Sequence, residues 1–284
     1  MTSNENRMTA LSCDTHVHFY DARYPSAPGA TLHPPDATTD DYRALQTELG
    51  FKRVVVVQPT TYGLDNSCQL DGIATFGHPD DGVARGVMVL NDSVSTDELR
   101  RLTKLGVRGA RFHMLPGGAV PWEMLEPVAA KIGSFGWHIQ LQCNGRELAA
   151  RQDQLAALPT QIVIDHIGRY MPPVPTSNDN FAALLRLVEA GHAWVKLSAP
   201  YESSTEPIHN DDHAGTNHAD VLPLIDMLVE RVADRLLWAS NWPHPGQSLA
   251  PSPSTLTTQL ERWLPTDELR HQVLVTNPDH LYFC

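Results

Sequence analysis

The chain has 284 residues, which is enough for one large domain with a substantial hydrophobic core. It is 42% hydrophobic and has a net charge of -12, which argues against binding to nucleic acid or to an anionic membrane surface. No apolar run approaches the roughly 20 residues of a membrane span, and Met1–Met8 is too polar for a signal peptide. We therefore expect a cytoplasmic protein, with a disordered lead-in over residues 1–10 and one domain over residues 11–284.

Short apolar runs rich in β-branched residues alternate along the chain with helical patterns. Eight of these runs predict strands, which in chain order are Leu11–Asp14, Val54–Val57, Gly86–Leu90, Val107–Phe112, His138–Gln142, Ile162–Asp165, Trp194–Leu197 and Leu236–Trp238. Apolar residues at helical spacing lie between them, over Tyr42–Leu49, Leu99–Leu102, Met124–Ile132, Phe181–Val188 and Leu222–Val232. Strands that alternate with helices indicate a parallel sheet, and eight such units favour a closed (β/α)8 TIM barrel in a single α/β domain.

Other features of the chain are less informative. Two segments, Pro116–Pro121 and Pro200–Asn217, are expected to be extra loops. The second is polar, and either a functional lid or a solvated loop would account for its histidines and aspartates (His209, Asp211, Asp212 and His213). The four cysteines are scattered without a C-x-x-C pair, so we expect free thiols.

Catalytic groups of such barrels lie at the carboxyl ends of the strands. The first strand ends in Asp14-Thr15-His16-Val17-His18. Residues i and i+2 of a strand point to the same face, so both imidazoles are expected to enter one cavity. A single histidine is usually structural, whereas two at strand spacing indicate a functional site.

Charged and polar residues also end the other strands. Arg111 lies near the end of the fourth strand, and the sixth is followed by His166 and Arg169. A buried arginine needs an anionic partner, which is either an internal carboxylate or a carboxylate of the substrate. Individually weaker candidates for substrate binding or catalysis follow the second, fifth, seventh and eighth strands: Thr60, Tyr62, Gln142, Lys196, Asn241 and His244.

In this order, these residues resemble the amidohydrolase superfamily, and within it the lactone-acting enzymes like 2-pyrone-4,6-dicarboxylate lactonase. The similarity spans about residues 11–284, and its matching pieces are His16-x-His18, the Val-Gln-x-Thr segment that ends at Thr60, Gly109–Phe112, Ile162–Arg169, Trp242–Pro245 and Val275–Tyr282. One departure matters. The resemblance implies an aspartate before Trp242, acting as the general base that activates water, but this chain has Asn241.

Many members of the superfamily bind zinc through strand-end histidines and the aspartate of the eighth strand. Here Arg111, Gln142 and Asn241 stand at positions that often bind metal in the superfamily. A zinc ion could still use His16, His18 and His166, although Arg111 and Arg169 would repel it. We therefore expect catalysis without a metal or other cofactor.

The resemblance and the amide together suggest a lactone isomerase, with His16, His18, His166 and Asn241 as the catalytic residues. It would convert an aldaric-acid 1,5-lactone, such as D-galactaro-1,5-lactone, to the 1,4-lactone through attack by the substrate's own hydroxyl. Arg111 or Arg169 would bind the substrate carboxylate, with Thr60, Tyr62, Gln142, Lys196 and His244 as further contacts. The alternatives are a metal-independent lactonase with His166 or Asp14 as base, a metal-dependent decarboxylase and a binding protein without catalysis; the sequence does not indicate the oligomeric state.

Overall fold

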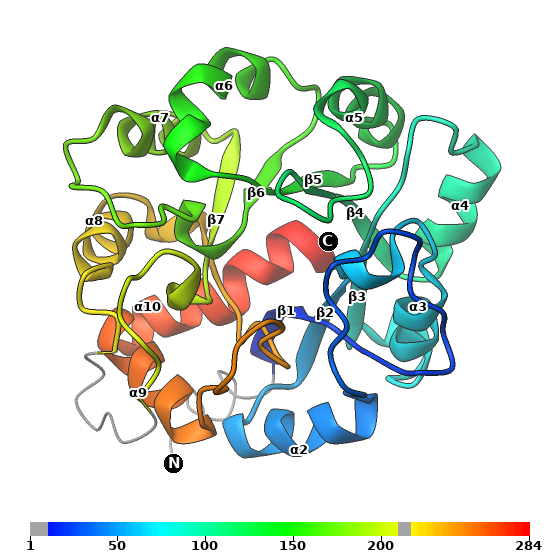
Figure 1. Cartoon of the computed structure of the whole chain (residues 1–284), viewed down its shortest axis with the longest axis horizontal. Coiled ribbons are helices and arrows are strands. Elements are labelled where there is room, and N and C mark those ends of the chain that lie inside the picture. Colours follow the sequence, from blue (N-terminus) through cyan, green and yellow to red (C-terminus); the bar gives the residue numbers. More distant parts are fainter. Residues whose placement is uncertain (1–10, 210–216) are drawn as a thin grey trace.

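Eight parallel strands follow one another around a barrel in chain order, and helices surround them (Figure 1). The computed structural model describes residues 11–209 and 217–284. The strands are β1 (Cys13–Val17), β2 (Arg53–Val57), β3 (Ala84–Met88), β4 (Val107–His113), β5 (His138–Gln142), β6 (Ile162–Ile164), β7 (Ala193–Leu197) and β8 (Leu236–Trp238). The predicted barrel is confirmed, whereas the expected lead-in at 1–10 and the loop residues Asp211, Asp212 and His213 lie outside the described residues.

The barrel closes between β1 and the segment that follows β8. The backbone N–H of Asn241 donates to the carbonyl of His16 at 3.1 Å, and the backbone N–H of His18 donates to the carbonyl of Trp242 at 2.9 Å. The buried Asp14 carboxylate strengthens the seam, because it accepts hydrogen bonds from the Ser240 amide at 3.0 Å and from the Ser240 hydroxyl. The first and last strands therefore meet at the end of the barrel where catalytic groups are expected.

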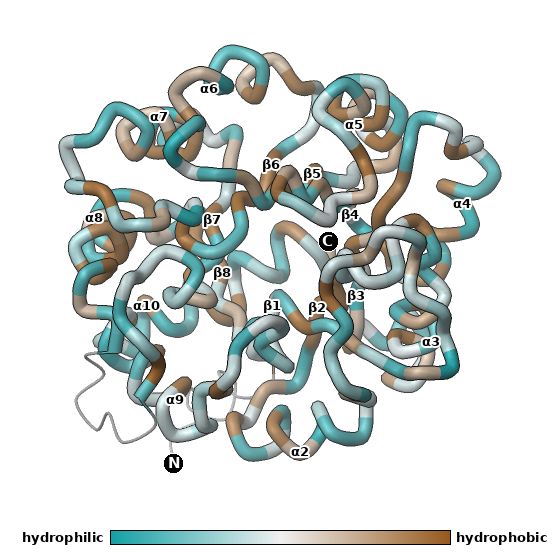
Figure 2. The backbone as a smooth tube through the Cα atoms, in the orientation of Figure 1, coloured by the Kyte–Doolittle hydropathy of each residue, from teal (hydrophilic) through white to brown (hydrophobic). Residues whose placement is uncertain are grey.

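The helices bury an apolar side against the outside of the strands. They are α2 (Thr39–Leu49), α3 (Ser67–Ala74), α4 (Thr96–Lys104), α5 (Leu125–Gly133), α6 (Leu148–Ala156), α7 (Asp179–Glu189), α8 (Leu222–Val232), α9 (Pro253–Trp263) and α10 (Asp267–His271). Figure 2 shows hydrophobic strand segments such as β6 inside and hydrophilic segments on the outer turns of α4 and α7. This division is expected for amphipathic helices around a parallel barrel.

We call the amino end of the barrel its floor. The C-terminal segment, with α10, η8 (Gln272–Thr276) and η9 (Asp279–Phe283), lies across the centre of the strand ring in Figure 1. Tyr282 is fully buried in an apolar cluster with residues of several strands, namely Cys13, Val55, Val57, Val87, Val163, Trp194 and Leu237. The guanidinium of Arg85 donates to the carbonyl of Tyr282 at 2.9 Å, and Arg53 donates to the carboxylate of Asp279 at 2.8 Å. The floor is therefore closed by packing.

Two expectations from composition can be compared with the fold. Across the residues that the structure describes, no helix is both long and apolar enough to cross a membrane. All four cysteines are unpaired, as predicted, with Cys284 exposed and the other three buried.

Candidate active site

We call the carboxyl end of the barrel its mouth, where His16 and His18 lie side by side. The pairing of β1 with β2 shifts its register between Asp14 and Val17, so the strict alternation of the strand is interrupted there. Asp14 contacts Tyr42 of the outer helix α2, whereas His16 Nε2 lies 3.1 Å from His18 Nε2. The two imidazoles are therefore brought together as predicted, and the Asp14 carboxylate is committed to the β1–β8 seam.

The protonation of this histidine pair can be traced from its partners. His18 Nδ1 lies 2.7 Å from the carbonyl of Val57, and a carbonyl only accepts, so His18 carries its proton on Nδ1. Burial, with Arg111 nearby, lowers the pKa of His18 to about 3, so its ring is neutral at pH 7 and its Nε2 accepts. His16 must then donate from its own Nε2, which leaves His16 Nδ1 as an acceptor.

The buried Lys196 supplies the matching donor to His16. Its ammonium lies 2.7 Å from the carbonyl of Thr15, 2.8 Å from Gln140 Oε1 and 3.3 Å from His16 Nδ1. These are three acceptors for the three protons of an ammonium group. Burial lowers the pKa of Lys196 to about 8, with the Asp165 carboxylate opposing the shift, so most of the lysine is charged at pH 7. Lys196 and His18 thus require the same tautomer of His16.

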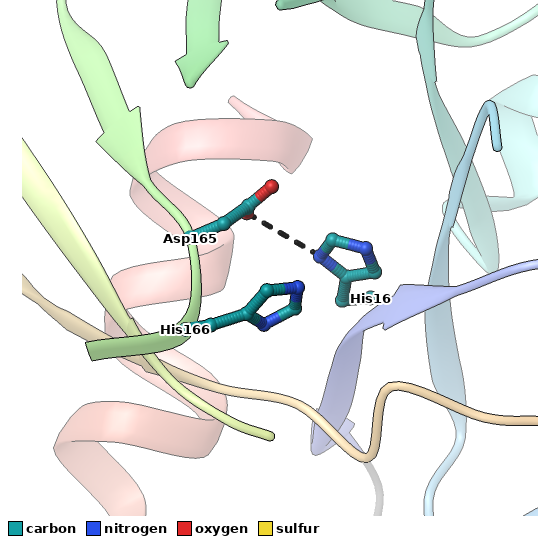
Figure 3. A group of neighbouring side chains, drawn as sticks. All are labelled: His16, Asp165 and His166. Carbon is teal, nitrogen blue, oxygen red and sulfur yellow. Dashed lines mark ion pairs between the residues drawn. The ribbon is translucent and has the colours of Figure 1, made fainter. Parts of the chain in front are cut away.

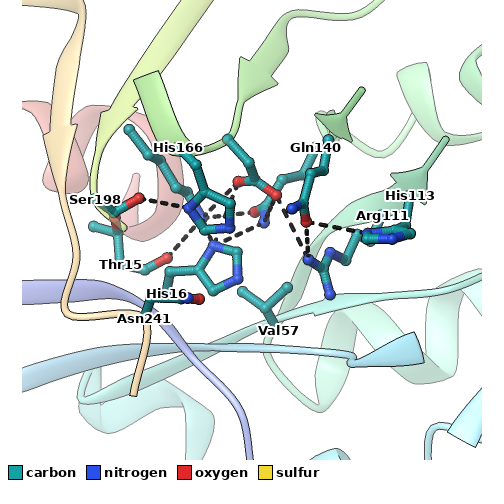
Figure 4. A network of polar contacts seen from close by, with 12 residues as sticks. Thr15, His16, Val57, Arg111, His113, Gln140, His166, Ser198 and Asn241 are labelled. Carbon is teal, nitrogen blue, oxygen red and sulfur yellow. Dashed lines mark hydrogen bonds and ion pairs between the residues drawn. The ribbon is translucent and has the colours of Figure 1, made fainter. Parts of the chain in front are cut away.

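Asp165 and Arg111 complete a buried network around these groups (Figure 4). Asp165 lies 3.4 Å from His16 Nδ1, 3.8 Å from Lys196 Nζ and 3.8 Å from the Arg111 guanidinium. Arg111 donates to the carbonyl of Gln58 and to Gln142 Oε1, both at 2.7 Å, while its Nε has no partner among the described residues. Arg111 therefore has both an internal carboxylate nearby and donor capacity left for a ligand.

A second hydrogen-bonded chain follows β8. The side-chain Nδ2 of Asn241 donates to the hydroxyl of Tyr201 at 2.9 Å, and this hydroxyl lies 3.0 Å from His244 Nδ1. Burial lowers the pKa of His244 to about 3, so its ring is neutral and Nδ1 accepts from Tyr201. Asn241 Oδ1 is buried and accepts no hydrogen bond within residues 11–209 and 217–284. Asn241 lies beside His16 in Figure 4, so this free acceptor is next to the histidines.

His166 extends the histidine group from β6. Its ring centroid lies 4.9 Å from that of His16, and its Nδ1 lies 2.9 Å from the hydroxyl of Ser198. Burial lowers the pKa values of His16 and His166 well below the ordinary histidine range. The site thus presents neutral imidazoles, which can donate hydrogen bonds but are weak bases.

Several site residues have a left-handed backbone. The φ angles are 54° at His166, 53° at Arg169, 62° at Asn241 and 63° at His244. Such a conformation costs a non-glycine residue about 1–3 kcal/mol and is typical of functional sites. Close loop packing accompanies it, because a Cβ on Gly145 would lie 2.1 Å from the carbonyl oxygen of Gly168. The loops after β5 and β6 are therefore in direct backbone contact.

The remaining predicted contacts lie in different surroundings. Thr60 lines a small pocket with Arg111, His113 and Val120, to which the predicted loop Pro116–Pro121 contributes. The Tyr62 hydroxyl instead bonds to the backbone of Asp21, which is a local loop contact.

Arg169 and Lys196 also have protein partners that limit their expected roles. Arg169 Nε donates to the carboxylate of Glu202 at 2.8 Å. Lys196 is completely buried beneath the histidines, with its three donors used by the protein. We therefore interpret Lys196 as a group that positions His16, in place of the expected contact with the substrate.

A family model described as amidohydrolase matches residues 13–284. The chain belongs to the amidohydrolase family. It is 33% identical to the 2-pyrone-4,6-dicarboxylate hydrolase of Comamonas testosteroni, with 98% of this chain and 92% of the relative aligned. It is 31% identical to the D-galactarolactone isomerase of Agrobacterium fabrum, with 95% and 90% aligned.

A solved structure supports the same relationship. The apo crystal structure of an Agrobacterium tumefaciens protein is 31% identical to this chain, has a TM-score of 0.86 and aligns over 96% of each chain. The predicted resemblance to the amidohydrolase superfamily is confirmed by these matches, and the barrel with its mouth is the scaffold of an amidohydrolase-family enzyme.

The amidohydrolase family raises the question of a metal ion. His16, Asp165 and His166 offer ligand atoms within 4.8 Å of one another, and Figure 3 shows them facing one space. The Lys196 ammonium, however, lies 3.3 Å from His16 Nδ1 and 3.8 Å from the Asp165 carboxylate. A cation of the protein thus already faces two of the three groups, and the Arg111 guanidinium adds repulsion. These residues do not fit a divalent ion.

The zinc set expected from the sequence differs from this group, because it has His18 where the group has Asp165. His18 Nε2 lies 3.1 Å from His16 Nε2, and its Nδ1 lies 2.7 Å from the carbonyl of Val57. The set of His16, His18 and His166 stays a prediction.

Two residues of the mouth, Asp165 and Glu202, were not singled out as site residues from the sequence. Asp165 carried a detectable signal, because a carboxylate at the end of a strand buried on both faces needs a partner. The role of Glu202 depends on which loops meet in space.

Proposed function

We propose that this protein is a lactone isomerase that converts an aldaric-acid 1,5-lactone, such as D-galactaro-1,5-lactone, to the 1,4-lactone. The names of the relatives support a lactone as substrate, since one is a lactone isomerase and another a pyrone-dicarboxylate hydrolase. The observation that carries the choice of isomerisation is Asn241, a neutral amide beside the catalytic histidines at the position where the resemblance implies a water-activating aspartate.

The reaction is an internal exchange of two oxygens on one carbonyl carbon. The hydroxyl oxygen on C4 attacks the lactone carbonyl carbon C1, forming the O4–C1 bond and a tetrahedral intermediate. Collapse breaks the C1–O5 bond, and the proton lost from O4 is returned to O5. No water is consumed and no acid is produced. An intramolecular nucleophile has an effective concentration of about 10⁵ M or more when well oriented, so it needs less help from a base than water does.

The neutral imidazoles suit the carbonyl end of this reaction. A neutral imidazole with its proton directed at the substrate can donate to the oxygen that becomes negative in the intermediate. Because the protons of His16 and His18 are bonded to His18 and to the Val57 carbonyl, His166 is the member of the group that would polarise the carbonyl and carry the proton between O4 and O5, with His16 and His18 beside it. The amide of Asn241 offers a free acceptor, Oδ1, to a substrate hydroxyl.

Hydrolysis by this site would be slow, because it needs a general base to take a proton from water. An amide cannot take a proton from water, and burial lowers the pKa of His18 to about 3, so that this imidazole is a weak base. The Asp14 carboxylate accepts hydrogen bonds from Ser240, from Tyr42 and from the backbone N–H of His16, so its oxygens are used by the protein. Asp165 Oδ2 accepts from Gln140 at 3.2 Å and the carboxylate lies 3.8 Å from Arg111 and from Lys196, while Oδ1 accepts no hydrogen bond among the described residues.

The carboxylate of the substrate would bind at Arg111. This side chain is buried, and its Nε has no partner among the described residues. Arginine is suited to paired hydrogen bonds with a carboxylate.

The Asn241→Asp variant tests the proposal. Proton NMR of D-galactaro-1,5-lactone should reveal ring transfer to the 1,4-lactone with the wild type, without base consumption in a pH-stat. The aspartate should raise hydrolysis to the open diacid by about 10²-fold, because it restores a general base. The control is Asn178→Asp, which makes the same change at the cap of α7, where Asp is an equally good cap. Rapid opening by the wild type without ring transfer would reject isomerisation.

A lactone hydrolase is the second candidate, and the 33% identity to the Comamonas hydrolase favours it. It would need a base other than Asn241, of which His166 is the remaining candidate in the histidine group. Proton release over a panel of carboxylated lactones distinguishes it from the isomerase, and binding without turnover would indicate a non-catalytic binding protein.

A further inference from the structure

A serine at the end of β7 holds the ring of His166, which follows the neighbouring strand β6. Ser198 comes directly after β7, and its hydroxyl lies 2.9 Å from His166 Nδ1 (Figure 4). Both residues are buried, with exposed fractions of 1% and 2%. Within residues 11–209 and 217–284, His166 Nδ1 is the one hydrogen-bond partner of this hydroxyl, and Ser198 is the one partner of the His166 ring.

The direction of this bond follows from the single proton of a hydroxyl group. If His166 Nδ1 donated to Ser198, the serine proton would be buried without an acceptor among the described residues, which is costly. If Ser198 donates to Nδ1, both groups are satisfied. The ring is neutral, because burial lowers the pKa of His166 well below the ordinary histidine range. A neutral ring that accepts at Nδ1 carries its proton on Nε2.

The main chain of His166 is also held in place, so the direction of the Nε2 proton is fixed. The backbone is left-handed here, with a φ of 54°. The carbonyl of His166 accepts from the backbone N–H of Arg169 at 2.9 Å and from the hydroxyl of Ser203 at 3.4 Å. In Figure 3 the ring faces the space that it shares with His16 and Asp165. With Nδ1 bonded to Ser198, Nε2 is the ring nitrogen that remains for a ligand in this space.

We propose that Ser198 is a positioning residue that fixes His166 in the tautomer with its proton on Nε2, so that the ring donates to the carbonyl oxygen of the lactone. The inference rests on the proposed function for the identity of the substrate, and it adds which ring nitrogen acts and which residue determines this.

The tautomer also gives an order to the proton transfers of the ring exchange. The Nε2 proton passes to the negative oxygen on C1 of the tetrahedral intermediate, and the proton on O4 takes its place on Nε2. The same exchange in reverse returns a proton to O5 as the C1–O5 bond breaks. The ring is therefore unchanged at the end, and Nδ1 keeps its bond to Ser198 throughout.

Nitrogen-15 NMR of the histidine-labelled protein tests the tautomer without substrate. Protonated and unprotonated imidazole nitrogens resonate far apart, and the signals of His166 are identified by their loss in His166→Gln. At pH 7 the wild type should show a protonated Nε2 and an unprotonated Nδ1. In Ser198→Ala the two signals should move toward each other, because no partner on Nδ1 then selects one tautomer. Ser198→Thr keeps the hydroxyl and should keep the wild-type signals.

The matched control is Ser203→Ala, which removes a hydroxyl that contacts the carbonyl of His166 and not its ring. It should leave both nitrogen signals in place. Thermal unfolding checks that each variant is folded. If Ser198→Ala does not fold, Ser198→Cys, whose thiol is a weak donor, should move the signals in the same direction.

The kinetics of the same variants give a second readout. Ser198→Ala should lower kcat for the 1,5-lactone by about tenfold, less than the roughly 10²–10³-fold cost of losing such a donor outright, because part of the population keeps the proton on Nε2. KM should stay within about threefold, and Ser198→Thr should restore kcat.

A proton on Nδ1 in the wild type, unchanged signals in Ser198→Ala, or an equal change in Ser203→Ala would overturn the inference. Because the NMR experiment needs no substrate, its failure is separate from failure of the isomerase assay with Asn241→Asp.

Discussion

The floor and the mouth of the barrel are built from the same strands but differ in chemistry. On two of these strands, a floor residue and a mouth residue are only two positions apart. On β7, Trp194 belongs to the apolar floor cluster, while Lys196 belongs to the charged network. Val163 of β6 and Asp165, which directly follows that strand, are related in the same way. Residues i and i+2 face the same side of a strand. The inner side of each of these strands is therefore apolar at one residue and charged at the next residue that faces inward. The floor stabilises the fold by apolar packing, and the mouth holds the buried charges.

The largest effect that would test this contrast is expected at the mouth. Arg111→Met should lower kcat/KM for a carboxylated lactone by about 10³-fold, because truncating a buried charge that pairs with ligand costs about 2–5 kcal/mol. The melting temperature should change little, since Asp165 keeps Lys196 as a nearby cation at 3.8 Å. Steady-state kinetics and thermal unfolding measure the two quantities. An unfolded variant would place Arg111 with the stabilising groups of the floor.

The floor should show the opposite response. Tyr282→Ala removes a fully buried ring from the apolar cluster and should lower the free energy of unfolding by about 3–5 kcal/mol, as for other buried aromatic truncations. Urea unfolding measures the loss. The folded fraction should keep its kcat/KM, because Tyr282 lies at the opposite end of the barrel from the histidines. Loss of kcat/KM in fully folded Tyr282→Ala would mean that the two ends are coupled.

A smaller effect concerns acid stability. Burial lowers the pKa of His138, at the start of β5, to about 3. The unfolded chain therefore binds a proton at this residue below pH 6.5 and the folded chain does not. Stability is then lost as the pH falls from about 6.5 toward 3, by about 1.4 kcal/mol per pH unit for each such histidine.

His138→Leu should remove the contribution of His138 to the loss of unfolding free energy at acid pH. Urea midpoints at pH 7, 6 and 5 measure it, and kcat/KM should stay within about threefold. Burial raises the pKa of Asp14 to about 6, so this residue increases the free energy of unfolding as the pH falls from 6 to 4, which opposes the effect of the histidines. The variant is therefore compared with the wild type at every pH. An unchanged slope in His138→Leu would mean that His138 is accessible to protons in the folded state.

The barrel could be predicted from the sequence because its strands are short, buried runs with strong periodicity. β3 was predicted at Gly86–Leu90 and is observed at Ala84–Met88. Arg85 interrupts the apolar pattern there, and only the fold provides its partner, the carbonyl of Tyr282 on the floor. The helices α3, α6, α9 and α10 were not predicted; Gly72 interrupts the first, and few apolar residues mark the second.

The candidate site was predictable where its residues are close in sequence. His16 and His18 needed only the strand period, and the C-terminal ends of the strands supplied Arg111, His166 and Asn241. The contact of Lys196 with His16 links residues 180 positions apart and depends on the register of the closed barrel. For this reason Lys196 was taken for a substrate contact, and the pairing of Arg169 with Glu202 was not foreseen.

The seam between β1 and β8 also has a consequence for the time course of biosynthesis. Asp14 and its partner Ser240 are separated by 226 positions. At about 5–20 residues per second, the ribosome needs roughly 10–45 seconds between the first histidine pair and the residues that close the ring around it. Throughout that interval β1 is an unpaired edge on one side, the kind of surface that other chains pair with. The enzyme therefore acquires its active site only at the end of translation, and the first strand must be protected until then.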